Sequence, residues 1–339
     1  MALRLAINGF GRIGRAAFKI ALAKKDITVV AINDLMDPKT LAHLLKYDTV
    51  YREYEKSVQP AKEGIKVGGT TYPVFSMKEP AKLPWKKLGV DVVLECSGIF
   101  TDKKSASEHL KAGARQVIIS APAKDTTTET LVFGTKQTNA TLKSRKADVV
   151  ISNASCTTNC ISPVMQVLES KFGIDKAMMT TVHSYTADQN LVDGPHRDLR
   201  RARAAAGNIV PTSTGAALST TKVVSSLHNL FDGIAIRVPT ICGSVSDITA
   251  VLKRKRVTVK DVNDAFKSAE KDPLYKNILI TTTRPIVSSD IIGSEYSAIV
   301  DLEFTRVVGG NLVKVLAWYD NEWAYSLRLV EMAQAVQKK

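Results

Sequence analysis

A cysteine and a histidine are placed where they could act together as a nucleophile and its base. Cys156 lies in the segment SCTTNC, which follows the apolar run 148–152 and opens a helical pattern over about 157–172. Near a helix N-terminus, unpaired N–H groups and the helix dipole lower the pKa of a thiol. His183 ends a later strand-like run, and a cysteine with a histidine base can attack an aldehyde. A buried, inert thiol is the competing interpretation of Cys156 taken alone, and we favour it for Cys160, one helical turn later.

A glycine-rich turn near the N-terminus has the spacing of a dinucleotide-binding motif. Its glycines, in the pattern G-x-G-x-x-G, are Gly9, Gly11 and Gly14. The motif follows the strand-like run 3–8 and opens a helical pattern over 12–24, the context in which glycines let the backbone approach a pyrophosphate. Asp34 ends the second strand-like run, where a carboxylate can accept the ribose hydroxyls of NAD and repel the extra phosphate of NADP. An ordinary capping turn followed by a turn aspartate is the alternative, but the combined pattern favours a dinucleotide.

The elements around the glycine turn predict an α/β fold class. Apolar runs alternate with amphipathic stretches as far as residue 154, which is typical of a mostly parallel sheet with helices on both faces. The expected strands are 3–8, 27–33, 90–96, 116–120 and 148–152, the expected helices are 12–24, 38–47 and 103–112, and a hairpin is expected at 68–69. We therefore predict a Rossmann-type dinucleotide-binding domain over 1–154, completed by a C-terminal helix at 321–339.

A different hydrophobic pattern over 155–320 predicts a second, catalytic domain. After one helix, longer strands alternate apolar and polar residues, which indicates an α+β domain with a mostly antiparallel sheet. The arginine-rich segment between His183 and Pro211 has little apolar content. Because long loops inside compact domains usually carry function, we expect this segment to contribute to the site.

Composition narrows the classes of protein. The chain has 339 residues, of which 45% are hydrophobic, and it lacks the run of about 20 apolar residues that a membrane span needs. Its 4 cysteines are too few and too scattered for a disulfide framework or a metal site, so we expect no metal and a reducing, cytoplasmic location. The net charge of +14 suits anionic substrates. Nucleic-acid binding is not predicted because none of its usual motifs occurs, and the basic run 253–256 is expected to be a solvated strand end.

The motifs together resemble one family. NGFGRIGR, ASCTTNC, HSYTADQ, RRARAAAGNIVPTSTGAA and WYDNEWAYS are similar to segments of phosphorylating glyceraldehyde-3-phosphate dehydrogenases, and the similarity runs from end to end. The resemblance implies oxidation of D-glyceraldehyde 3-phosphate to 1,3-bisphosphoglycerate in glycolysis or gluconeogenesis, with reduction of NAD and a thioester on the cysteine. It also implies a homotetramer and an S-shaped loop, here 184–210, near the cofactor and the subunit interface.

The resemblance assigns roles residue by residue. Cys156 matches the nucleophile of the family and His183 its general base. The residues that match NAD contacts are Gly9, Gly11, Arg12, Ile13, Gly14, Asp34, Ser120 and Asn321. The residues that match the inorganic-phosphate site are Ser155, Thr157, Thr214 and Gly215, with Arg203 beside them. The residues that match the site of the substrate's own phosphate are Thr186, Asp188 and Arg237.

The sequence departs from the family pattern at one position, and other dehydrogenase classes are alternatives to this interpretation. Ala324 stands where the family usually has glycine, so either the backbone there is strained or the position is an ordinary first helical turn. An erythrose-4-phosphate dehydrogenase is the nearest alternative, because it shares the motifs but releases its acid by hydrolysis. Semialdehyde dehydrogenases that use NADPH are less compatible with Asp34, and Pro195 is similar to NAD-preferring members of the family.

Overall fold

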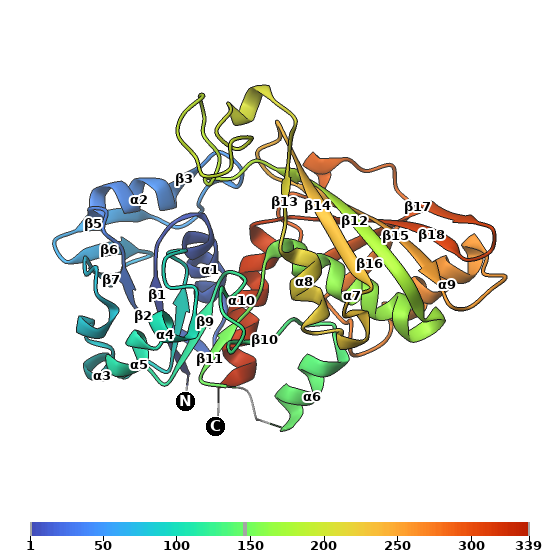
Figure 1. Cartoon of the computed structure of the whole chain (residues 1–339). Helices are drawn as coiled ribbons and strands as arrows, with labels where there is room; N and C mark the ends of the chain where they lie inside the picture. The colour runs from blue at the N-terminus through green and yellow to red at the C-terminus, as the bar shows by residue number, and fades with distance from the viewer. Residues whose placement is uncertain (1, 145–147, 338–339) are drawn as a thin grey trace. The chain divides into compact units, whose positions relative to one another are not determined.

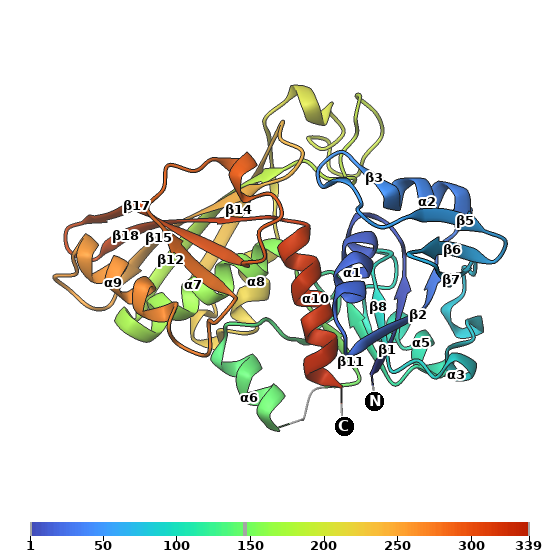
Figure 2. The same cartoon turned by 180° about the vertical axis from the view of Figure 1, so that it is seen from behind.

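The computed structural model describes residues 2–144 and 148–337, and within them the chain forms two compact units (Figures 1 and 2). The first unit combines Met1–Leu131, Thr141–Ala154 and Tyr325–Lys339. The second combines Val132–Ala140 and Ser155–Ala324. The segment 132–140 was expected in the first domain, but it packs with the second unit instead.

The first unit is built on a nine-stranded sheet, counted over the described residues, with the order β10-β11-β9-β8-β1-β2-β7-β6-β5. The strands are β1 (Leu3–Asn8), β2 (Ile27–Asn33), β5 (Val58–Ala61), β6 (Gly64–Val67), β7 (Thr70–Phe75), β8 (Val92–Glu95), β9 (Gln116–Ile119), β10 (Glu129–Thr130) and β11 (Val150–Ser152). The strands from β10 to β7 pair in parallel, whereas β5, β6 and β7 form an antiparallel meander at one edge. The β6–β7 hairpin turns at Gly68-Gly69, as the sequence predicts.

Helices flank this sheet, and a short two-stranded ribbon lies beside it (Figure 1). The helices are α1 (Arg12–Ala23), α2 (Pro38–Lys46), α3 (Trp85–Leu88), α4 (Lys103–Ala106), α5 (Glu108–Lys111) and α10 (Trp323–Val336), and the ribbon is β3 (Tyr47–Asp48) with β4 (Arg52–Glu53). The single helix expected over 103–112 is divided at Ser107 into α4 and α5. Ala324 lies in the first turn of α10, so the helical interpretation of this position is confirmed.

The second unit is built on a seven-stranded sheet, again counted over the described residues, with the order β13-β14-β12-β15-β18-β17-β16. The strands are β12 (Ile174–Ser184), β13 (Val210–Ser213), β14 (Phe231–Val238), β15 (Ser244–Leu252), β16 (Leu279–Thr282), β17 (Ala298–Val308) and β18 (Leu312–Tyr319). Four of the pairings are antiparallel, while β12–β14 and β16–β17 are parallel. The helices are α6 (Lys136–Ser144, which begins in this unit), α7 (Cys156–Phe172), α8 (Ala216–Thr221) and α9 (Val259–Ala269), and α7, α8 and α9 pack against the sheet.

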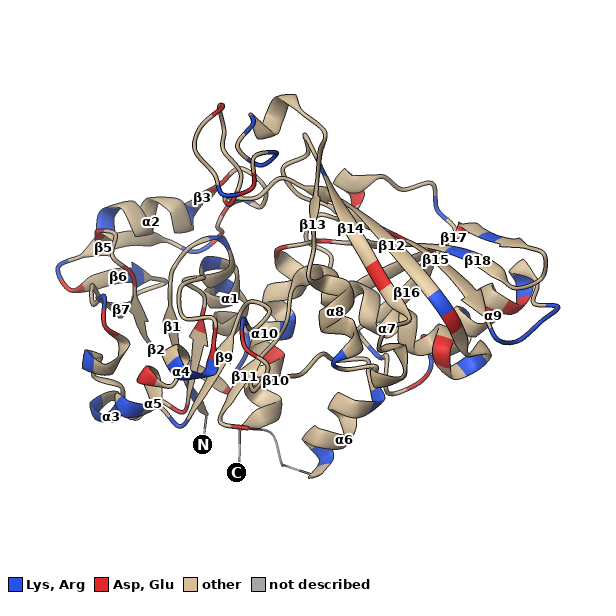
Figure 3. Ribbon diagram, in the orientation of Figure 1, with Lys and Arg blue, Asp and Glu red and all other residues tan. Residues whose placement is uncertain are grey.

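Two exposed segments of the second unit complete the description. The long segment between β12 and β13 has the short 3-10 helix Ala205–Gly207 as its regular structure. The basic run 253–256 forms an exposed turn directly after β15, as expected for a solvated strand end (Figure 3). None of the helices within the described residues is long and apolar enough to cross a membrane.

Candidate active site

A strained turn presents Cys156 as the first residue of α7. Ala154 has a φ of 55°, a left-handed conformation that costs a non-glycine residue roughly 1–2 kcal/mol. Two hydrogen bonds hold this peptide: the Ala154 N–H donates to Ser152 Oγ (3.0 Å), and the Tyr325 hydroxyl donates to the Ala154 carbonyl (2.8 Å). Ser155 then caps α7 by accepting a hydrogen bond from the Thr158 N–H at 3.1 Å. The turn therefore fixes the cysteine at the helix N-terminus.

The thiol of Cys156 lies against the imidazole of His183. The Sγ–Nε2 distance is 3.4 Å, and the histidine is buried at the end of β12. Tyr319 packs edge-on against the imidazole, with ring centroids 6.0 Å apart. The Tyr319 hydroxyl lies 2.9 Å from Thr157 Oγ1 and 2.8 Å from Thr181 Oγ1, so it ties the first turn of α7 to β12. This geometry would suit a nucleophile beside its general base.

Burial controls the charge state of the pair. It raises the pKa of the Cys156 thiol, although the positive charge of Arg237 and local hydrogen bonds oppose the shift. Burial and then Arg237 lower the pKa of His183 to about 3. Both shifts favour the uncharged forms of the pair, a thiol and an imidazole. The sequence-based expectation of a lowered thiol pKa is wrong for this state, because burial penalises the thiolate more than the helix N-terminus favours it.

Strand register places Arg237 beside the base. His183 in β12 pairs with Arg237 in the parallel strand β14. The Arg237 Nη1 lies 2.8 Å from His183 Nδ1 and 2.9 Å from the Ser184 carbonyl, which itself lies 2.7 Å from Nδ1. Arginine can only donate and a carbonyl can only accept, so Nδ1 satisfies one of these neighbours at a time. When Nδ1 carries the proton and donates to Ser184, the Nε2 lone pair faces the thiol and can accept its proton.

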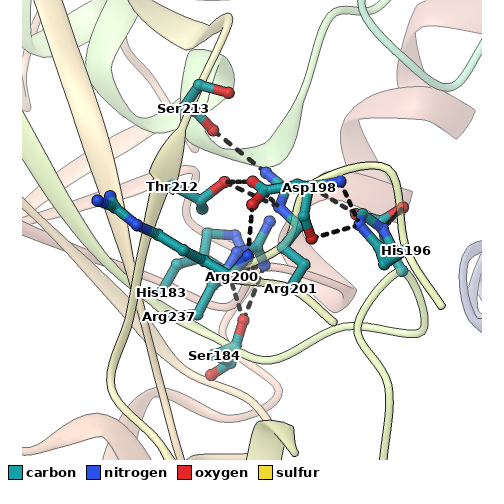
Figure 4. A network of polar contacts seen from close by, with 10 residues as sticks. His183, Ser184, His196, Asp198, Arg200, Arg201, Thr212, Ser213 and Arg237 are labelled. Carbon is teal, nitrogen blue, oxygen red and sulfur yellow. Dashed lines mark hydrogen bonds and ion pairs between the residues drawn. The ribbon is translucent and has the colours of Figure 1, made fainter. Parts of the chain in front are cut away.

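A second arginine, Arg201 of the S-shaped loop, lies near Arg237 and His183 (Figure 4). Arg201 forms an ion pair with Asp188, and its Nε donates to Thr212 Oγ1 at 2.9 Å. Its side chain is largely buried, with 16% exposed. Arg203, which the sequence placed at the phosphate site, instead pairs with Asp193 at 2.8 Å, and its side chain is 62% exposed. The structure thus brings Arg201, and not Arg203, to Asp188, one of the residues expected around the substrate's own phosphate.

The remaining residues expected at phosphate lie on loops and helix starts of the second unit. Thr214 Oγ1 accepts a hydrogen bond from the Ala216 N–H (3.2 Å), and Gly215 directly precedes α8. Thr186 lies in the loop after β12, where its carbonyl accepts from the Gln189 N–H. The hydroxyl of Thr157 is buried against Tyr319, so its backbone N–H is the better candidate to meet an anion.

A pocket of about 460 Å³ in the first unit contains part of the glycine motif. Its lining includes Gly9, Gly11 and Asp34. Asp34 Oδ2 accepts from the Phe10 N–H at 2.7 Å, which joins the carboxylate to the glycine turn. A Cβ on Gly14 would lie 2.1 Å from the Gly9 carbonyl, so only glycine lets α1 pack this closely on the turn.

The pocket suits a dinucleotide for physical reasons visible in its geometry. A Cβ added to Gly11 would meet no atom within 4 Å among the described residues, so the turn is open to a large group at this point. Gly11 is the N-cap of α1 and gives no side-chain cap, which leaves backbone N–H groups to bind an anion. Arg12 and Ile13 form the first turn of α1, and Arg12 pairs with Asp48 at 2.6 Å.

Two further NAD contacts expected from the sequence lie elsewhere in the chain. Ser120 follows β9 and forms a side-chain hydrogen bond with Cys96, which lines the pocket. Asn321 belongs to the second unit, where its Oδ1 accepts from the Gly243 N–H and the Ser244 hydroxyl, both at 3.0 Å. The amide nitrogen of Asn321 is left to donate to another group.

A largely parallel sheet carries a glycine turn with an acid at the end of its second strand, and the same chain holds a cysteine–histidine pair. This combination is typical of a nicotinamide-dependent aldehyde dehydrogenase of the covalent type. Comparisons with known proteins narrow this class. Residues 3–103 match the NAD-binding domain of glyceraldehyde 3-phosphate dehydrogenase, and residues 155–321 match the C-terminal domain of the same family. The chain belongs to the glyceraldehyde-3-phosphate dehydrogenase family. This membership assigns it the NAD-dependent oxidation of glyceraldehyde 3-phosphate.

Relatives from bacteria are similar over the whole length. The glyceraldehyde-3-phosphate dehydrogenase of Streptomyces coelicolor is 51% identical over 333 residues, which cover 98% of each chain. That of Geobacillus stearothermophilus is 49% identical over 339 residues, covering 100% of this chain and 99% of the relative. The enzyme of Borreliella burgdorferi is 48% identical over 343 residues, covering 99% of this chain and 100% of the relative. These names favour the glyceraldehyde 3-phosphate reaction over the erythrose 4-phosphate alternative.

Proposed function

We propose that the chain oxidises and phosphorylates glyceraldehyde 3-phosphate through a thioester on Cys156. The observation that supports this most directly is the 3.4 Å contact between Cys156 Sγ and His183 Nε2. As the sulfur attacks the aldehyde carbon, His183 takes the thiol proton and then returns it to the aldehyde oxygen, which becomes the hydroxyl of a hemithioacetal. N–H groups at the start of α7 are suited to stabilise the developing oxyanion.

The oxidation step removes two electrons from the hemithioacetal carbon. His183 accepts the hydroxyl proton while the hydride leaves that carbon, and the carbonyl of a thioester forms. NAD, when bound, supplies the hydride acceptor. Inorganic phosphate then attacks the thioester carbon and loses its proton to water, while the carbon–sulfur bond breaks. The proton held by His183 returns to the sulfur, and the acyl phosphate leaves Cys156 as a free thiol. Gly9, Gly11, Gly14 and Asp34 are the residues we propose to hold the cofactor, because they shape the pocket of the first unit.

In our proposal, one arginine binds the phosphate of the substrate and a second binds inorganic phosphate. Arg237, with Thr186 and Asp188, would hold the phosphate of the substrate, because Arg237 lies directly beside His183. Arg201 would take the role first assigned to Arg203, together with Ser155 and the Thr214-Gly215 turn, at inorganic phosphate. Its guanidinium also donates to the Ser213 carbonyl at 3.2 Å, directly before Thr214, which supports this choice.

The decisive experiment is a phosphate titration at saturating NAD and glyceraldehyde 3-phosphate. NADH formation should depend on phosphate and should be restored by arsenate, which can also attack the thioester. Full turnover with neither anion present would mean that water releases the product, as in the erythrose-4-phosphate alternative. Erythrose 4-phosphate, tested in parallel, should be the poorer substrate.

Assembly and location complete the proposal. We propose a homotetramer because apolar side chains of the S-shaped loop are strongly exposed in the single chain. They are Leu191, Val192, Leu199 and Ile209. We also propose a cytoplasmic location, since all four cysteines are free thiols and a reducing compartment keeps the nucleophile active.

A further inference from the structure

A buried carboxylate, Glu95, lies beneath the pocket of the first unit and has no part in the mechanism above. It ends β8, and its side chain is fully buried. Four donors among the described residues converge on it. The Ser97 N–H (2.8 Å) and the Ser97 hydroxyl reach Oε1, while Asn8 Nδ2 (2.5 Å) and His109 Nε2 (3.0 Å) reach Oε2. Because both oxygens of this buried carboxylate accept hydrogen bonds, it rigidifies the groups that donate to it.

The tautomer of His109 is fixed from its other side. Trp85 Nε1 lies 3.0 Å from His109 Nδ1, and an indole N–H can only donate. Nδ1 is therefore the acceptor, so Nε2 carries the proton and donates to Glu95. Trp85 and His109 are both fully buried, and their rings stack with centroids 6.3 Å apart. This pair holds the carboxylate in place from the interior of the unit.

Two of the residues that donate to Glu95, Ser97 and Asn8, also line the pocket. Ser97 lines the pocket, and its Oγ accepts a hydrogen bond from the N–H of Ile99, another lining residue, at 3.2 Å. A Cβ on Gly9 would lie 2.5 Å from the Ser97 nitrogen, so this turn rests directly on the first glycine of the motif. Any shift of Ser97 would therefore change the space that the glycine turn leaves open.

Asn8, which also donates to Glu95, is hydrogen-bonded to residues in another part of the pocket lining. Asn8 Oδ1 accepts from Asn33 Nδ2 at 2.7 Å, and Asn33 Oδ1 accepts from the Met77 N–H at 2.9 Å. All three residues line the pocket, and Asn33 directly precedes Asp34. A single carboxylate is thus linked to the Ser97 turn and to the strand that carries the ribose-binding acid.

We propose that Glu95 is a positioning residue for the nucleotide, one that fixes the Ser97 turn and the Asn8–Asn33–Met77 chain as the two sides of the cofactor pocket. The proposal rests on the assignment of this pocket to NAD. Glu95 itself touches no substrate in this role. It acts through Ser97 and Asn8, so its loss should weaken cofactor binding without touching the chemistry at Cys156.

The test uses the full-length enzyme with Glu95→Gln and the milder Ser97→Ala. A charge-assisted hydrogen bond is typically worth about ten- to a hundredfold in an equilibrium constant. Glu95→Gln should therefore raise the Kd for NAD, measured by calorimetry, by about tenfold or more, and Ser97→Ala by a smaller factor. The KM for glyceraldehyde 3-phosphate and the rate of Cys156 alkylation without cofactor should stay at their wild-type values.

Thr128→Val is the matched control. It removes one buried hydroxyl that donates to a carboxylate, Asp125, in the same unit but outside the pocket lining, and it should leave the Kd for NAD unchanged. A Glu95→Gln enzyme with a lower Tm but a wild-type Kd would overturn the proposal. If that variant does not fold, an unchanged Kd in Ser97→Ala overturns it.

Asp34→Gly separates this inference from the pocket assignment. If only Asp34→Gly weakens NAD binding, the assignment of the pocket to NAD is supported and the positioning role of Glu95 is wrong. If neither Asp34→Gly nor Glu95→Gln changes the Kd, the pocket itself has been misassigned and both proposals fall.

Discussion

Cys156 and Cys160 lie one helical turn apart, yet their surroundings differ. Cys156 faces a histidine, whereas Cys160 is fully buried and contacts the Ala317 carbonyl at 3.7 Å. Cys156→Ser should abolish dehydrogenase activity, because a hydroxyl is a far weaker nucleophile at neutral pH. Cys160→Ser is the matched control and should keep most of the activity. Steady-state assays and mass spectrometry of alkylated protein check this, and inactivation that tracks Cys160 labelling would contradict it.

Arg237 affects the pKa values of both Cys156 and His183. After burial, its positive charge is the next cause that lowers the pKa of His183, and it also lowers the pKa of Cys156. Removing the charge in Arg237→Ala should therefore raise both pKa values. The pH midpoint for iodoacetamide alkylation of Cys156 should move upward, while Arg237→Lys should stay closer to wild type. This assay needs no substrate, so lost phosphate binding cannot affect it; a midpoint that moved to lower pH would refute the argument.

Arg201 and Arg203 form a natural pair of variants, two residues apart. Arg201→Ala should raise the KM for inorganic phosphate by about ten- to a hundredfold, the usual worth of a charge-assisted bond. Arg203→Ala removes an exposed ion pair and should change phosphate kinetics little. Phosphate titrations of the two variants decide between them. A larger effect from Arg203→Ala would restore the assignment made from sequence.

The junction of β1 and α1 depends on glycines for two separate reasons. Gly14 is in contact with the Gly9 carbonyl, so Gly14→Ala forces α1 outward and should cost about 1–3 kcal/mol of stability. Gly11 has open space beside it among the described residues, so Gly11→Ala should fold normally but obstruct a bound pyrophosphate. Thermal unfolding and NAD titration together test this. Equal losses of Tm in both variants would show that Gly11 is structural as well.

The S-shaped loop exposes apolar side chains that the proposed homotetramer would cover. Leu199 and Ile209 are 80% and 70% exposed. Replacing both with aspartate should break a homotetramer into smaller species, because burying carboxylates at an interface is costly. Light scattering on a sizing column measures the mass. Val308→Asp, on a 64%-exposed residue at the end of β17, is the control, and a wild-type enzyme that elutes as a monomer would refute the tetramer.

Apolar periodicity and glycine spacing are local properties of the chain, so they predict the two kinds of sheet, most of the longer strands and the helices α1, α2, α7 and α10. They did not predict the strands β10, β13 and β16 or the helices α6, α8 and α9. The sequence also singled out Cys156, His183 and Asp34, which lie at the ends or starts of elements. It did not separate Arg201 from Arg203, since adjacent arginines in a loop look alike until the loop is folded. Nor did it reveal Glu95 beneath the pocket. These points depend on the folded chain, as do the directions in which the pKa values of Cys156 and His183 shift, because burial and long-range contacts arise from residues far apart in the sequence.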